Sequence, residues 1–222
     1  MSEMSEPNLA KDLVRIHKVV TRGLDVAIER GQTFRRDGYP DATTREGYMR
    51  YIQSLAAVLE GHHLAEDEIA FPFFREKRLA APYDRLAADH EQIQSILGEV
   101  AEALQGAAGE KGELALDDLV GALERVIAVW GPHIQKEEAH FAEEKLKAVV
   151  DLAEEGVMSG RIAKHSAEHS KPEYLVVPFV LYNLSPQDRA VMAGMLPPVV
   201  VEQLVPQVWK DQWAPMKPFL LD

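Results

Sequence analysis

The chain contains no cysteine among its 222 residues. Without cysteine it can form no disulfide, no zinc ribbon, no iron–sulfur cluster and no thiolate nucleophile. Any metal ion that the protein binds must therefore be held by histidine and carboxylate side chains. The sequence is well supplied with both, since it has 8 His and 36 Asp and Glu residues.

The sequence also lacks a long apolar run and an excess of positive charge. No stretch approaches the roughly 18 consecutive apolar residues that a membrane-spanning helix needs, and the opening residues MSEMSEPN do not have the pattern of a signal peptide. The formal net charge of -12 opposes binding to nucleic acid or to an anionic membrane. We therefore expect a soluble, cytoplasmic protein with no nucleic-acid partner and no membrane partner.

Helical periodicity dominates the first two thirds of the chain. Apolar residues recur at intervals of three and four, which predicts amphipathic helices over about residues 8–30, 43–72, 82–104 and 114–140. Gly31 is expected to end the first helix. A capping box of Thr43 and Glu46 begins the second helix, and Pro72 bends or ends it. Four such helices with modest loops predict an all-α, up-down-up-down four-helix bundle.

Each predicted helix carries a histidine on its buried stripe, and in chain order these are His17, His62, His90 and His133. Two stripes continue into a glutamate one helical turn later, Glu66 in the second helix and Glu137 in the fourth. At a rise of about 1.5 Å per residue, the six side chains lie at the same height in a bundle to within about 4–6 Å. The spacing therefore predicts that they converge on one layer of the core.

Two buried glutamates need positive partners, because an unpaired charge inside a protein is costly. No lysine or arginine lies on the stripes near Glu66 or Glu137. A single histidine on an apolar stripe is usually an ordinary core residue, but one on every stripe together with two acids favours a metal site. Imidazole and carboxylate ligands suit iron, manganese or zinc better than calcium or magnesium, and two carboxylates on facing helices can bridge two metals.

At these residues the sequence resembles a known family. The segments "HHLAEDEIAFP" and "HIQKEEAHF", preceded by "RIHKVV" and "ADHEQI", are similar to those of the hemerythrin-like (HHE cation-binding) domain over about residues 8–145. The resemblance implies a non-haem, carboxylate-bridged centre of two iron ions. The terminal ligands that it implies are His17, His62, His90 and His133, and the bridges are Glu66 and Glu137.

Two positions depart from the classical hemerythrin pattern. Where that pattern has a second histidine one turn from His90, this sequence has Leu86 or Gln94. Where it has an aspartate five residues after the histidine of the fourth helix, this chain has Glu137 four residues after it. The first departure leaves the centre one histidine short of the classical set.

Other histidines can replace the missing ligand. His63 lies at the edge of the second stripe and is included among the expected metal ligands. His140 lies on the fourth stripe, and the sequence leaves open whether it binds metal or supports the core. The remaining polar candidates are expected to be solvated: His165 and His169 outside the bundle, and the acidic residues Asp67, Glu68, Glu138, Glu143 and Glu144.

The last part of the chain differs in character from the rest. We expect residues 1–156 to form the bundle and residues 157–222 to form a proline-punctuated extension. Its short helices are predicted over about residues 173–183, 186–195, 198–205 and 206–213. Trp209, Trp213, Met216 and Phe219 belong to an apolar set too large to face water. The extension is therefore expected to pack on the bundle, or on a second subunit in a homo-oligomer.

Three functions fit these observations. The first is a di-iron protein that binds O2 or a related small ligand such as peroxide, as a carrier, store or sensor. The second is a di-iron enzyme of peroxide or oxygen chemistry, and the third is an iron-responsive interaction module. The resemblance does not separate them, because function depends on the surroundings of the open coordination position. It assigns no catalytic residue, and it leaves open whether the protein is an enzyme.

Overall fold

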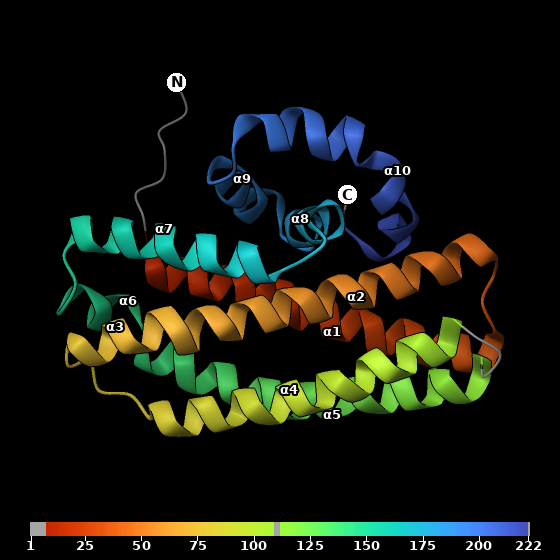
Figure 1. Cartoon of the computed structure of the whole chain (residues 1–222), viewed down its shortest axis with the longest axis horizontal. Helices are drawn as coiled ribbons and strands as arrows, with labels where there is room; N and C mark the ends of the chain where they lie inside the picture. The colour runs from red at the N-terminus through yellow and green to blue at the C-terminus, as the bar shows by residue number, and fades with distance from the viewer. Residues whose placement is uncertain (1–7, 109–111, 222) are drawn as a thin grey trace.

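Four long helices form the body of the protein. The computed structural model describes residues 8–108 and 112–221. The long helices are α1 (Leu9–Asp37), α2 (Ala42–Ala65), α4 (Tyr83–Ala108) and α5 (Gly112–His140). Each packs against two of the others, so that α1, α2, α4 and α5 close into a ring with neighbours antiparallel (Figure 1). This confirms the predicted all-α, up-down-up-down bundle.

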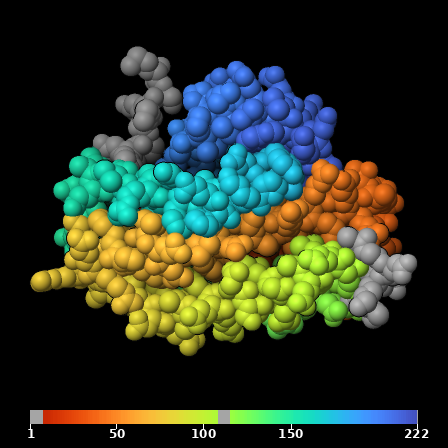
Figure 2. Space-filling view, in the orientation of Figure 1, coloured from red at the N-terminus to blue at the C-terminus, as the bar shows by residue number. Residues whose placement is uncertain are grey.

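Shorter helical segments connect and cover the bundle. They are η1 (Glu66–Ala70), α3 (Phe71–Glu76), α6 (Glu143–Lys147), α7 (Leu152–His169), α8 (Glu173–Tyr182), α9 (Pro186–Gly194), η2 (Val200–Val208), α10 (Lys210–Trp213) and η3 (Ala214–Phe219). The segments from α7 onward lie over α1 and α2, on the side of the bundle away from α4 and α5 (Figures 1 and 2). Among the described helices, none combines the length and the apolar character needed to cross a membrane.

Two helix ends differ from the sequence-based expectation. Helix α1 does not stop at Gly31 but runs on to Asp37, and Gly38 ends it with a φ of 78°. Gly31 serves packing instead, because a Cβ there would lie 2.4 Å from the hydroxyl of Tyr48 on α2. The N-cap of α2 is Asp41, whose carboxylate accepts the Thr44 N–H, so the predicted capping box two residues later is wrong.

The second helix changes geometry before Pro72 rather than at it. Residues Glu66–Ala70 form a π-helical turn, in which the Phe71 N–H donates to the Glu66 carbonyl five residues back. In a regular helix the ring of Pro72 would clash with the carbonyl of Glu68, four residues earlier. The wider turn relieves that clash and changes the direction of the side chains that follow His63. Such single π-turns are frequent at functional sites.

The apolar core is divided into two clusters. The larger cluster includes Val20, Leu59, Ile93 and Trp130. The smaller cluster, near the α2–α4 connection, includes Phe71 and Phe141. The buried histidines and glutamates of the four helices lie between the two, in sequence and in space. The bundle therefore encloses a polar layer with apolar side chains above and below it.

The C-terminal extension packs on the bundle through buried apolar side chains. Trp213, Met216 and Phe219 belong to the larger core cluster. A polar link fastens the same region: Tyr51 of α2 donates to the Asn183 side chain at 2.8 Å, and Arg22 of α1 donates to that same side chain.

Helices α8 and α9 match the segments predicted over 173–183 and 186–195 within one residue. The two helices expected to meet at residue 206 are instead one π-helical run through Pro206, followed by α10. The expected boundary between residues 156 and 157 falls inside α7.

Candidate metal centre

The structure brings together all seven residues that the sequence singled out as metal ligands. His17 comes from α1, His62 and His63 from the end of α2, Glu66 from η1, His90 from α4, and His133 and Glu137 from α5. None of these residues is more than 6% exposed. Helical spacing explains the convergence, because residues four apart on one helix face the same neighbour.

The donor atoms fall into two overlapping groups. His17, His62, Glu66 and Glu137 form the first, which we call position A, with one donor atom from each residue within 4.8 Å of the others. Glu66, His90, His133 and Glu137 meet the same criterion and form position B. His63 joins position B, since its ring nitrogen groups with those of His90 and His133 within the same limit.

The two glutamates are shared between the positions almost symmetrically. Glu66 Oε2 lies 3.4 Å from His62 Nε2 and 3.4 Å from His90 Nε2. Glu137 Oε2 lies 3.2 Å from His17 Nε2 and 3.2 Å from His133 Nε2. Each carboxylate oxygen therefore faces one imidazole of position A and one of position B. This is the arrangement that a carboxylate-bridged pair of metal ions requires.

The donor atoms have the unsatisfied character expected of a metal site. The Nε2 atoms of His17 and His62, both nitrogens of His63, Glu66 Oε2 and both oxygens of Glu137 are buried without a hydrogen-bond partner among the described residues. Buried polar atoms are almost always hydrogen-bonded, because desolvating them without compensation is costly. Here one donor atom from each residue lies within 4.8 Å of the others in its group, so the residues fit a cation held between them.

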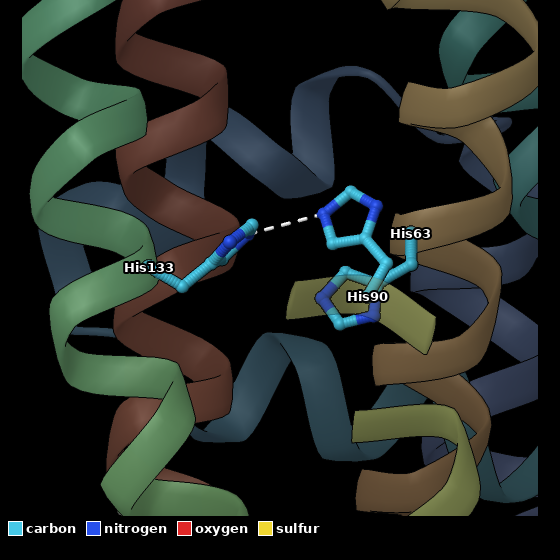
Figure 3. Close-up of side chains that lie close together, drawn as sticks. All are labelled: His63, His90 and His133. Carbon is cyan, nitrogen blue, oxygen red and sulfur yellow. Dashed lines mark hydrogen bonds between the residues drawn. The ribbon is translucent and has the colours of Figure 1, made fainter. Parts of the chain in front are cut away.

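The three histidines of position B are closely packed. His133 projects from α5 toward His63 and His90, and its Nε2 lies 3.1 Å from His90 Nε2 (Figure 3). The rings of His63 and His90 are stacked, with centroids 4.0 Å apart and planes 15° apart. The ring of Phe71, from α3, also stacks on the ring of His90, with centroids 5.6 Å apart.

Comparison with known protein families gives one match. The model of the hemerythrin HHE cation binding domain matches residues 8–144, which include all seven residues of the cluster. The chain belongs to this family. Neither the curated proteins nor the solved structures searched gave a match. The matched segment ends before α7, so the extension over α1 and α2 is an addition to the hemerythrin domain.

A second set of carboxylates surrounds the hemerythrin cluster, and we call Asp67, Asp89 and Glu138 the outer carboxylates. Glu138 Oε1 lies 2.9 Å from His17 Nδ1, and Asp67 Oδ1 lies 2.9 Å from His90 Nδ1. Asp89, which is buried, lies 3.7 Å from His133 Nδ1 and is itself paired with Lys136 at 2.8 Å. Each therefore contacts the ring nitrogen that faces away from the cluster.

The outer carboxylates correct one expectation and add a residue. Asp67 and Glu138 were expected on a solvated face, but their side chains are only 35% and 40% exposed and contact cluster histidines. Asp89 was missed altogether. A signal was present, since Asp67 follows Glu66, Glu138 follows Glu137, and Asp89 precedes His90. A carboxylate that accepts the Nδ1 proton of a histidine fixes the tautomer that leaves Nε2 free to bind metal.

Replacing Glu138 with glutamine is expected to weaken metal binding without changing the number of ions bound. Loss of the charged partner leaves His17 less firmly oriented and less basic, and such changes typically cost about 10- to 100-fold in metal affinity. Competition with a chromophoric chelator measures the affinity. Glu144→Gln, in an exposed acid on α6, is the matched control. Equal affinities for Glu138→Gln and the unmodified chain would contradict the assigned role.

Burial shifts the proton affinities on the His62 side of the cluster. It lowers the pKa of His62 and His63 well below the usual histidine value, and the surrounding imidazoles add to that effect. Burial also raises the pKa of Glu66 well above its usual value, and repulsion from Glu137 acts in the same direction. Without a cation, burial and the neighbouring Glu137 therefore both favour the neutral form of Glu66.

The pKa values of Glu137 and His17 are shifted in the other sense, toward the charged forms of both side chains. Burial alone would raise the pKa of Glu137, but contacts with His133 and His17 outweigh it, so the pKa lies below the usual value. Burial would likewise lower the pKa of His17, and Glu137 and Glu138 outweigh it and raise that pKa. A cation entering the cluster competes with these protons and releases them.

The other histidines lie outside the cluster. His140 Nδ1 faces the Lys136 carbonyl at 2.7 Å, and Phe141 rather than His140 continues the buried line of α5. His165 differs from the solvated residue expected, because its side chain is only 15% exposed and its Nε2 lies 2.8 Å from Glu68 of η1. His169 is exposed, as predicted.

A cavity of about 160 Å³ opens beside the cluster. His62 and Glu66 lie on its lining, which otherwise consists mainly of apolar side chains from α1, η1, α3, α7 and α9. Trp130 is not part of that lining. It is fully buried with its ring centroid within 6.0 Å of four of the imidazoles, and its indole N–H donates to Thr21 at 2.9 Å. The cavity therefore reaches the edge of the cluster that holds position A.

Proposed function

We propose that the protein is a non-haem di-iron hemerythrin that binds O2 or a related small ligand, as a carrier, store or sensor. Glu66 and Glu137 would bridge the two ions. The terminal ligands would be His17 and His62 at position A, and His63, His90 and His133 at position B. Bound iron supplies redox chemistry and a coordination position for a diatomic ligand or peroxide.

The observation that carries the proposal is the unequal donor supply of the two positions. Both positions have two imidazoles and the two shared carboxylates, and the imidazoles of position B have a third, that of His63, grouped with them. Two histidines with carboxylate and open positions are typical of non-haem iron that reacts with O2. The cavity touches His62, which belongs to position A alone, and Glu66, which the two positions share. An exogenous ligand would therefore bind at position A, from the cavity side.

The surrounding side chains support this function in two ways. Trp130, Phe71 and Phe141 are buried against the cluster and exclude bulk water from it. Glu138 would accept the Nδ1 proton of His17, which orients its Nε2 inward. The Asp67 carboxylate lies 2.9 Å from His90 Nδ1 and places negative charge beside that ring. A dry, oriented set of ligands favours reversible binding of a neutral diatomic over hydrolysis or leakage of protons.

The optical spectrum of the iron-loaded protein tests the proposal. The protein is loaded with ferrous iron without air, then exposed to air, and in a separate sample to peroxide. We expect a charge-transfer band in air that disappears when O2 is removed, and no band in a zinc-loaded control. Sustained gas evolution from peroxide would instead indicate the enzyme. A spectrum unchanged by air and peroxide would contradict ligand binding and favour the interaction module.

The proposal also covers the cellular location of the protein, its partners and the roles of its two parts. We place the protein in the cytoplasm, without nucleic-acid or membrane partners, on the basis of its net charge of -12 and its cysteine-free sequence. Residues 1–156 would act as the metal-binding unit and residues 157–222 as an extension that covers it. Val199 and Val208 of the extension, 47% and 62% exposed, offer apolar contacts for a second copy in a homo-oligomer.

A further inference from the structure

The cavity beside position A is built from two parts of the chain. Leu13 of α1, Phe71 of α3 and Phe141 form part of the wall that the hemerythrin domain supplies. Ile162 of α7, Met192 of α9 and Met195, which follows α9, come from the segment beyond residue 144, outside the family match. The extension therefore covers part of a face that the hemerythrin domain alone would leave open, and the two together form the cavity.

The size of the space exceeds what a diatomic ligand needs. An apolar cavity of about 150 Å³ lined by leucine, isoleucine and phenylalanine stays dry and binds benzene. The cavity here measures about 160 Å³ and has a lining of the same kind. The lining also carries a few polar side chains, among them Asp12, whose Oδ1 is paired with Arg15 at 2.6 Å and whose Oδ2 is buried without a hydrogen-bond partner.

The outer end of the cavity is suited to the entry of such a molecule. Met195 is 48% exposed, and Met192 is half-buried beside it on α9. Methionine side chains are unbranched and adapt their shape to an apolar partner. The inner end is closed by His62 and Glu66, so the cavity runs from these methionines to the edge of the metal centre.

We propose that this cavity binds a small apolar organic molecule, of about the size of benzene, next to position A. This inference rests on the proposed function in one respect, namely that a metal ion at position A would lie next to the bound molecule. The hydrophobic effect supplies the affinity, since the molecule leaves water for a mainly apolar lining. The extension thus helps to determine which organic molecule lies beside the metal centre. A ligand bound at position A would contact that molecule.

Titration with fluorobenzene, followed by 19F NMR, tests the proposal on the full-length chain. The metal-free protein should bind the probe saturably. Ile162→Trp fills the cavity and should weaken binding at least tenfold. Val157→Trp, on the same helix but 66% exposed and outside the lining, is the matched control and should bind as the unmodified chain does. In the iron-loaded protein the bound signal should broaden, because the probe lies beside a paramagnetic ion.

A second variant keeps the test decisive if Ile162→Trp does not fold. Leu13→Ala enlarges the cavity and should admit 1-fluoronaphthalene, which the unmodified chain should bind at least tenfold more weakly. No saturable binding of fluorobenzene by the metal-free chain, or equal effects of Ile162→Trp and Val157→Trp, would overturn the proposal even if iron binds normally. Saturable binding that only Ile162→Trp and Leu13→Ala alter would uphold the cavity even if the spectrum shows no reaction with O2.

Discussion

Removing the metal is expected to lower the melting temperature of this protein by about 10 °C. An ion that binds only the folded state stabilises it by mass action, by about 4 kcal/mol at a thousandfold excess over Kd. For a chain of this size each kcal/mol shifts the melting temperature by about 2–4 °C. Without the ions, buried imidazoles and carboxylates with unsatisfied donor atoms separate the two apolar clusters. Thermal unfolding followed by circular dichroism measures the difference.

The control for this experiment is the identity of the added ion. Ferrous iron returned to the chelated protein should restore the original melting temperature. Magnesium at the same concentration should not, because it prefers oxygen ligands and keeps its water, whereas the cluster is rich in imidazole. If the metal-loaded and the chelated protein melted at the same temperature, the metal would contribute nothing to holding the layer together.

Glu66→Ala is expected to reduce the metal content from two ions per chain to at most one. One oxygen of Glu66 lies 3.4 Å from an imidazole of each position, so its removal takes a ligand from both. Position B keeps its three imidazoles and Glu137, while position A is left with His17, His62 and Glu137. Elemental analysis of the purified protein, normalised to protein concentration, gives the number of ions.

The neighbouring acid on the same π-turn is the matched control. Glu68 is 55% exposed and contacts His165 rather than the cluster, so Glu68→Ala should keep two ions per chain. Glu66→Gln preserves the size of the side chain and should also lose an ion, which separates the loss of a ligand from the loss of packing. Two ions bound to both Glu66 variants would rule out the bridging role.

Much of this protein could be predicted from its sequence because helices impose a regular relation between sequence and position. Residues three and four apart share a face of a helix, so the apolar stripes show which side of each helix is buried. His17, His62, His90 and His133 interrupt those stripes, and the spacing places them at one height. Since a bundle has one core, side chains on its four inner faces must meet there.

Other features depended on contacts between segments far apart in the chain. The approach of α1 to α2 needs a residue without a Cβ, so Gly31 remains inside a helix that its propensity would end. Asp67 and Glu138 reach histidines on α4 and α1, a pairing that only the packing of helices creates. The π-turn over Glu66–Ala70 is likewise a local change of geometry that periodicity does not reveal.

The cavity is the clearest case of a feature decided by tertiary structure. Leu13, one turn before His17 on α1, lies on the apolar stripe of its helix and lines the cavity. Ile162, Met192 and Met195 belong to segments whose apolar residues showed only that they had to pack somewhere. Burial of apolar area is non-directional, so it drives a segment onto a surface without specifying which one. Only the folded arrangement of α7 and α9 on α1 and α2 places these side chains beside the metal centre.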